Sequence, residues 1–208
     1  MTPIQITILL IMVTFYAVYF TKQAMQRKEG VTTLILGKGD KPQRVKDIEK
    51  WLKILSFSLP LVEILSMYWN LMELPAWIQW IGAGVAAIGV AFFCAAVWTM
   101  KGSWRAGIPE KKETSLITDG IFKYSRNPAF VGFDLLYLGI LIAFPNAWHA
   151  CFVAAAGYAF HQQILNEEEY LTQNFGDENS VVWFSREKPM YDKNFWDIVD
   201  EWIVMGFN

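Results

Sequence analysis

The chain has 208 residues, of which 54% are hydrophobic and only 18% charged, an apolar composition for a domain of this length. Its net charge of −2, with no aromatic side chains interleaved among the basic residues of the loop 22–50, argues against nucleic-acid binding. The two cysteines, Cys94 and Cys151, have neither CxxC nor metal-ligand spacing, so we expect packing residues, with no disulfide framework and no metal site. The composition therefore favours a membrane protein.

The positive charges fall into three clusters separated by long apolar stretches. Nine of the Lys and Arg residues lie within 22–53, six within 101–126 and three within 186–193. A helix needs about 20 apolar residues to cross a ~30 Å hydrocarbon core. The sequence therefore predicts an all-α integral membrane protein with about five transmembrane helices, at residues 4–20, 54–74, 75–100, 128–144 and 147–165.

The placement of the charges also predicts an orientation. All three basic clusters fall on the cytoplasmic side if the N-terminus faces outside, and the C-terminus is then cytoplasmic. Aromatic side chains are expected at both membrane interfaces. The outer set is Tyr68, Trp69, Trp77, Trp80 and Trp148, and the inner set is Trp51, Trp98 and Trp104.

We divide the chain into three parts within one structural domain. Residues 1–100 are expected to form a three-span bundle with a basic loop at 22–50, which contains a short apolar run at 31–36 and which we interpret as a juxtamembrane anchor attracted to acidic headgroups. Residues 101–178 hold a loop and a helical hairpin. Residues 179–208 are predicted to contain an amphipathic tail helix with an acidic face, which we expect to pack on the protein or on a protein partner.

The hairpin predicts a polar site at the membrane surface. Pro145 and Asn146 leave almost no linker between its two helices, so their other ends meet on the cytoplasmic side. One end carries Arg126 and Asn127, and the other carries the polar run 161–169. Two acids fall within predicted spans, Glu63 and Asp134. Asp134 is the stronger functional candidate, because it lies six residues beyond Pro128, about 9 Å along a helix.

Three motifs carry a family resemblance. SWRAGI at residues 103–108, LITDGIFKYSRNPAFVG at 116–132 and NEEEYLTQNFG at 166–176 occur in an order and spacing similar to those of the isoprenylcysteine carboxyl methyltransferase and phospholipid methyltransferase superfamily. The resemblance covers roughly residues 94–178. It implies methyl transfer from S-adenosylmethionine to a small lipophilic acceptor, with the cofactor entering from the cytosol and the acceptor from the bilayer.

The resemblance also assigns roles to individual positions. Arg126, Gln163 and Asp134 are the candidate catalytic residues, and the resemblance implies that a loop, a neighbouring wall and one carboxylate bind the cofactor. The cofactor-binding residues it implies are Thr114, Ser115, Leu116, Ile117, Phe122, Asn127, Pro128, Phe130 and Glu167. A carboxylate suits this role because it accepts hydrogen bonds from ammonium and hydroxyl groups.

Two positions depart from the family pattern. The usual Arg-His-Pro is Arg126, Asn127 and Pro128 here, and asparagine still donates a hydrogen bond. Gln163 stands where the carboxyl methyltransferases carry an arginine that pairs with the acceptor carboxylate. Because glutamine lacks the charged fork of arginine, a carboxylate acceptor is disfavoured. Thiols, amines and phospholipid headgroups stay as alternatives.

Two other functions compete with methyl transfer. Membrane sterol-type reductases, which use NADPH, have a similar hairpin entrance, but their pattern places an acid where this chain has Phe133. A non-catalytic membrane scaffold that keeps the same fold is motivated by Asn127, Gln163 and the altered tail.

Overall fold

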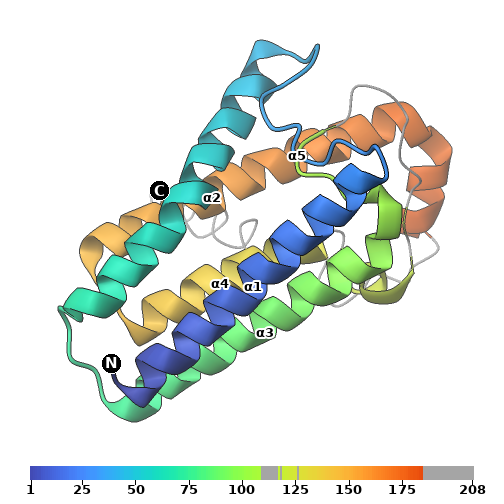
Figure 1. Cartoon of the computed structure of the whole chain (residues 1–208). Helices are drawn as coiled ribbons and strands as arrows, with labels where there is room; N and C mark the ends of the chain where they lie inside the picture. Colours follow the sequence, from blue (N-terminus) through green and yellow to red (C-terminus); the bar gives the residue numbers. More distant parts are fainter. Residues whose placement is uncertain (109–116, 118, 126, 185–208) are drawn as a thin grey trace.

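The computed structural model describes residues 1–108, 117, 119–125 and 127–184. Long helices lying side by side make up most of this part of the chain (Figure 1). The described residues contain no strand, and their backbone pairing outside helices includes one isolated parallel bridge between Leu34 and Ala106. The prediction of an all-α fold is confirmed. The helices are α1 (Pro3–Lys28), α2 (Gln43–Trp69), α3 (Ala76–Met100), α4 (Pro128–Ala143) and α5 (Ala147–Phe184), with short 3-10 helices η1 (Lys101–Ser103) and η2 (Gly120–Lys123).

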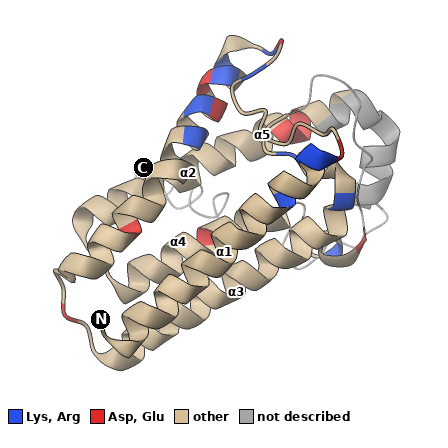
Figure 2. Ribbon diagram, in the orientation of Figure 1, with Lys and Arg blue, Asp and Glu red and all other residues tan. Residues whose placement is uncertain are grey.

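Within the described residues, three segments are long and apolar enough to cross a membrane: α1, α2 and residues 76–103, which comprise α3 with η1. The helix α4 is apolar but shorter. Lys and Arg gather at one end of the bundle, where α1 and α3 end and α2 begins (Figure 2). This combination of apolar helices and terminal charge is that of an integral membrane protein.

The helix bounds differ from the predicted spans at their polar ends. The helix α2 begins at Gln43, well before the apolar stretch that starts at residue 54, and α5 continues to Phe184, well past residue 165. Hydropathy marks only the part of a helix that lies in lipid, whereas Lys, Glu and Gln extend the helix into water. The break before α3 lies where it was predicted, since Pro75 is its N-cap. The predicted tail helix of residues 195–203 lies outside the described residues.

The helices α3 and α4 form the most extensive helix pair of the described chain. Glycines on both helices bring the two backbones together: an added Cβ at Gly89 would lie 2.7 Å from the carbonyl oxygen of Gly132, and one at Gly82 would lie 2.5 Å from that of Gly139. Small residues allow such close packing in lipid, where dispersion contacts drive helix association. This packing fixes α4, which carries several of the predicted site residues.

Aromatic side chains fill the space between α1, α3 and α4. Phe15 is fully buried, and its ring centroid lies 4.4 Å from that of Phe93. Trp104, expected at the inner interface, is instead only 4% exposed and makes an edge contact with Tyr19. Trp98 of the same predicted set is 84% exposed, as an interfacial residue should be.

A short connection joins α4 to α5, as predicted, but α5 packs mainly on α2. Asn146 in this connection accepts a hydrogen bond from the His149 amide (2.8 Å) and donates to the Ser66 hydroxyl of α2 (2.8 Å). Both contacts are buried. Asn146 therefore caps the first turn of α5 and fixes that end of the helix against α2.

Replacing Asn146 with alanine is expected to lower the free energy of unfolding by about 1–3 kcal/mol, because the His149 amide and the Ser66 hydroxyl lose a buried partner. Denaturant titration of the detergent-solubilised protein measures this loss. The matched control is Ser58→Ala, since the Ser58 hydroxyl donates to the carbonyl of Leu55 in its own helix (3.1 Å) and joins no second helix within the described residues. Equal losses in the two variants would contradict the proposed role of Asn146.

Candidate functional site

Two polar residues of α5 meet at the charged end of the bundle. Gln163 and Glu167 are one helical turn apart, and the Gln163 Nε2 donates to Glu167 Oε1 at 3.0 Å. The Gln163 side chain is fully buried, and its Oε1 has no hydrogen-bond partner among the described residues. Both residues were predicted to belong to the site, and the structure brings them into contact. Buried polar groups are seldom left unpaired. The Oε1 of Gln163 is therefore available to accept a hydrogen bond from a further donor.

The environment of Glu167 changes its acidity. Glu167 lies beyond the apolar part of α5, which ends at residue 165. Its pKa is raised from 4.5 to about 7, mainly by desolvation of the carboxyl, and the nearby carboxylates of Glu49 and Glu168 act in the same direction. The hydrogen bond from Gln163 and the charge of Lys41 act in the opposite direction. Glu167 is therefore a carboxyl group that exchanges its proton near neutral pH.

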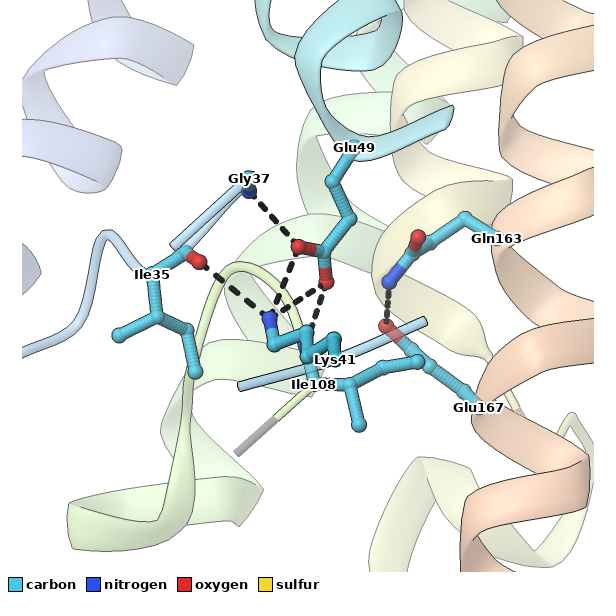
Figure 3. Close-up of polar contacts among 7 residues, drawn as sticks. All are labelled: Ile35, Gly37, Lys41, Glu49, Ile108, Gln163 and Glu167. Carbon is cyan, nitrogen blue, oxygen red and sulfur yellow. Dashed lines mark hydrogen bonds and ion pairs between the residues drawn. The ribbon is translucent and has the colours of Figure 1, made fainter. Parts of the chain in front are cut away.

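A buried ion pair lies beside these residues (Figure 3). The Lys41 ammonium contacts the Glu49 carboxylate at 2.8 Å, and the two side chains are only 6% and 0% exposed. The same carboxylate accepts hydrogen bonds from the backbone amides of Gly37 (2.7 Å) and Ile108 (2.9 Å). Sequence reasoning missed this pair, because Glu49 stands in a strongly basic run that reads as a solvated loop.

The loop between α1 and α2 packs on the protein around this pair. The amide of Ile35 donates to the carbonyl of Ala106 (3.0 Å), and the amide of Ala106 donates to the carbonyl of Thr33 (2.8 Å). Leu36 is buried in the core, and Gly107 takes a positive φ of 105° beside the Leu36 backbone. Part of the apolar run 31–36 thus packs against residues 106–107 of the described chain.

The beginning of α4 carries three further predicted residues. Asn127 is the N-cap residue, although its side chain makes no capping hydrogen bond, and Pro128 is buried at the first helical position. The ring centroid of Phe130 lies 5.1 Å from that of Phe160 on α5. This contact joins the wall of α4 to the helix that carries Gln163 and Glu167.

The other predicted residues are more dispersed or are not described. Asp134 is half-buried on α4, one turn after Phe130, and Ile117 and Phe122 are also half-buried. Thr114, Ser115, Leu116 and Arg126 lie outside the described residues. The described part of the candidate site therefore consists of the α5 pair, the beginning of α4 and the buried ion pair.

Residues 81–173 match the sequence model of the isoprenylcysteine carboxyl methyltransferase family. The match covers fewer than half of the 208 residues, so it is this part of the chain that is similar to the family. The matched range includes α3 from Ile81, all of α4, and α5 through Gln163 and Glu167. The motif resemblance found in the sequence is confirmed.

Two relatives carry the same printed name, protein-S-isoprenylcysteine O-methyltransferase. The protein of Schizosaccharomyces pombe is 37% identical over 67 residues, which cover 32% of this chain and 28% of the relative. The protein of Dictyostelium discoideum is 29% identical over 111 residues, which cover 50% of this chain and 47% of the relative. The chain thus spans less than half the length of these methyltransferase relatives.

The range that matches the family model begins at residue 81, well after the N-terminus of the chain. Lys41, Glu49 and the loop that surrounds them precede residue 81 and fall outside the family match. The residues around Glu167 therefore come from a hairpin that matches the family model and from an N-terminal segment that the model does not cover.

Proposed function

We propose that this chain is a membrane methyltransferase that transfers the methyl group of S-adenosylmethionine to a small lipophilic acceptor at the cytoplasmic membrane surface. The observation that carries the proposal is the Gln163–Glu167 pair. It lies within the family-matched hairpin, at the charged end of an apolar helical bundle. Homology supplies the reaction class, and the pair supplies a cofactor-binding carboxyl group.

S-adenosylmethionine supplies an electrophilic methyl group on a cationic sulfonium. Glu167 is suited to accept hydrogen bonds from the ammonium or hydroxyl groups of such a ligand, because a nearby cation favours the ionised carboxylate. Gln163 orients Glu167 through its Nε2 and keeps its Oε1 for a second donor. The described residues therefore fit a cationic, donor-rich cofactor.

The remaining predicted residues complete the proposal. We assign Thr114 to Ile117 to the adenosyl portion, and Phe122, Asn127, Pro128 and Phe130 to the wall beside it. Phe130 and Phe160 present apolar rings at this wall, which favours exclusion of water from the methyl group. Methyl transfer is an in-line displacement, so positioning contributes most of the rate enhancement. It needs no covalent intermediate on the protein.

The acceptor is proposed to be lipophilic and to lack a carboxylate at the reacting atom. Gln163 has no positive charge to pair with a carboxylate, whereas its Oε1 can accept from a thiol, an amine or a hydroxyl. Arg126 and Asp134 are proposed to act at the acceptor side of the site. An apolar acceptor reaches α4 and α5 directly from the bilayer.

Calorimetry with S-adenosylhomocysteine tests the cofactor assignment. We expect saturable binding to the detergent-purified full chain at pH 8, where Glu167 is ionised, and no heat with NADPH. Absence of binding at about 1 mM, an affinity of only ~4 kcal/mol, would contradict the proposal. Binding of NADPH that is insensitive to S-adenosylhomocysteine would favour a reductase. A radiolabelled-methyl screen over thiol, amine, carboxylate and phospholipid acceptors would distinguish an active enzyme from a scaffold.

A further inference from the structure

The Lys41–Glu49 ion pair is unusually well buried for an ion pair. Its two side chains are 6% and 0% exposed, whereas the Lys50–Asp47 pair of the same helix end is 56% and 52% exposed. Removing two charges from water is costly, and a well-packed apolar pair at such a position is often as stable or more stable. Stability alone therefore gives little reason for charges at this position.

The pair connects three segments that are distant in sequence. Lys41 lies at the end of the loop between α1 and α2, and Glu49 belongs to α2. The Ile108 amide that Glu49 binds lies six residues before Thr114, where the segment expected to hold the adenosyl group begins. Lys41 also donates to the carbonyl of Ile35 at 3.4 Å. Figure 3 shows the pair between this loop and the Gln163–Glu167 side chains of α5. The two backbone amides on Glu49 hold the loop and Ile108 in a fixed relation to α2.

We propose that Lys41 and Glu49 are a positioning pair for the cofactor site. They fix the backbone at Gly37 and Ile108, and their opposite charges act on the Glu167 carboxyl in opposite directions and largely cancel there. The inference rests on the proposed function, because it concerns the same carboxyl group. It adds two residues from outside the family-matched range to that site.

The balance follows from the charged and polar groups that face Glu167. From α2, Glu49 disfavours its ionisation, and from the preceding loop Lys41 favours it. On α5 itself, Glu168 disfavours ionisation, while the hydrogen bond from Gln163 favours it. Arg44 at the beginning of α2 is held by Gln162 of α5 at 3.4 Å. Removing one member of the pair therefore leaves the other charge unopposed at Glu167.

The test measures the pH midpoint of S-adenosylhomocysteine binding by calorimetry. In Glu49→Gln, Lys41 is left alone, and we expect the midpoint to move to lower pH. In Lys41→Met, Glu49 is left with its two amide donors and without its cation, so the midpoint should move to higher pH. The double variant should return towards the wild-type midpoint. Asp47→Asn, which removes an exposed charge from the same helix, is the control and should leave the midpoint unchanged.

Hydrogen exchange tests the positioning part. Glutamine at position 49 keeps only one acceptor oxygen, so exchange of the Gly37 or the Ile108 amide should accelerate in Glu49→Gln and not in Asp47→Asn.

Unchanged exchange at both amides, unshifted midpoints, or shifts in the same direction for both single variants would overturn the inference while leaving the proposed function intact. Failure of the wild type to bind overturns the proposed function itself. If Lys41→Met does not fold, Glu49→Gln is compared with the double variant, and equal midpoints overturn the inference.

Discussion

Replacing Glu167 with glutamine is expected to weaken the binding of S-adenosylhomocysteine at pH 8 by about 10- to 150-fold. The substitution removes a charge-assisted hydrogen bond to a ligand ammonium or hydroxyl, and such bonds contribute about 1.5–3 kcal/mol. The amide keeps the shape of the side chain and can still accept from Gln163. Loss of affinity would therefore report the missing charge. Calorimetry on the purified full chain measures it.

The same residue predicts a pH dependence with a definite sign. Burial raises the pKa of Glu167 from 4.5 to about 7 in the free protein, so much of it is protonated at pH 6.5. A cationic ligand favours the carboxylate, and binding should therefore release a proton below pH 7 and tighten as the pH rises towards 7. Above that range the affinity should level off. At pH 6.5 the observed binding enthalpy of the wild type should vary with the ionisation enthalpy of the buffer, and that of Glu167→Gln should not.

Glu169→Gln is the matched control for both measurements. Glu169 is exposed on the same helix and accepts a hydrogen bond from Gln173 at 3.2 Å, so its loss removes equal charge without touching the site. We expect its affinity and its buffer dependence to equal those of the wild type. If Glu167→Gln also binds like the wild type at pH 8, the carboxylate assignment is wrong.

Hydropathy and charge predicted the helical membrane fold because the bilayer imposes both signals on the sequence. An apolar run of about 20 residues has few alternatives to a spanning helix. The same reasoning could not predict where α2 begins or α5 ends, since Gln43 and Phe184 lie in polar sequence where hydropathy no longer distinguishes helix from loop. Nor could it predict that α5 packs mainly on α2, which depends on side-chain fit.

The site was predictable where its residues lie close together in sequence. Gln163 and Glu167 share a helix face, so their contact follows from a spacing of four. Glu49 and Ile108 are 59 positions apart, and their hydrogen bond exists only because the loop after α1 folds back over residues 104–108. No local pattern marks such a contact. We interpreted the basic segment as a surface anchor because of its average charge. That average gives no sign of the buried ion pair between Lys41 and Glu49.

The second large effect is expected at the contact of α3 with α4. A Cβ added at Gly139 would approach the Ala86 amide nitrogen and lie 2.6 Å from the Gly82 carbonyl oxygen. Both neighbours are backbone atoms, so relief requires the two helices to move apart. Gly139→Ala should therefore lower the free energy of unfolding by about 1–3 kcal/mol, as for other overpacked interiors. Because α4 carries Pro128 and Phe130, we also expect weaker S-adenosylhomocysteine binding.

Gly84→Ala separates this packing effect from the general effect of removing a glycine from a helix. Gly84 lies on α3 with no atom within 4 Å of an added Cβ, so alanine there should leave the helix contact intact and stabilise the chain by about 0.5–1 kcal/mol through reduced backbone freedom. Denaturant titration in detergent should thus show the two variants moving in opposite directions. Equal stability of the two variants would mean that α4 can shift along α3 without a cost in free energy. The close glycine contact would then not be what positions the beginning of α4 beside Glu167.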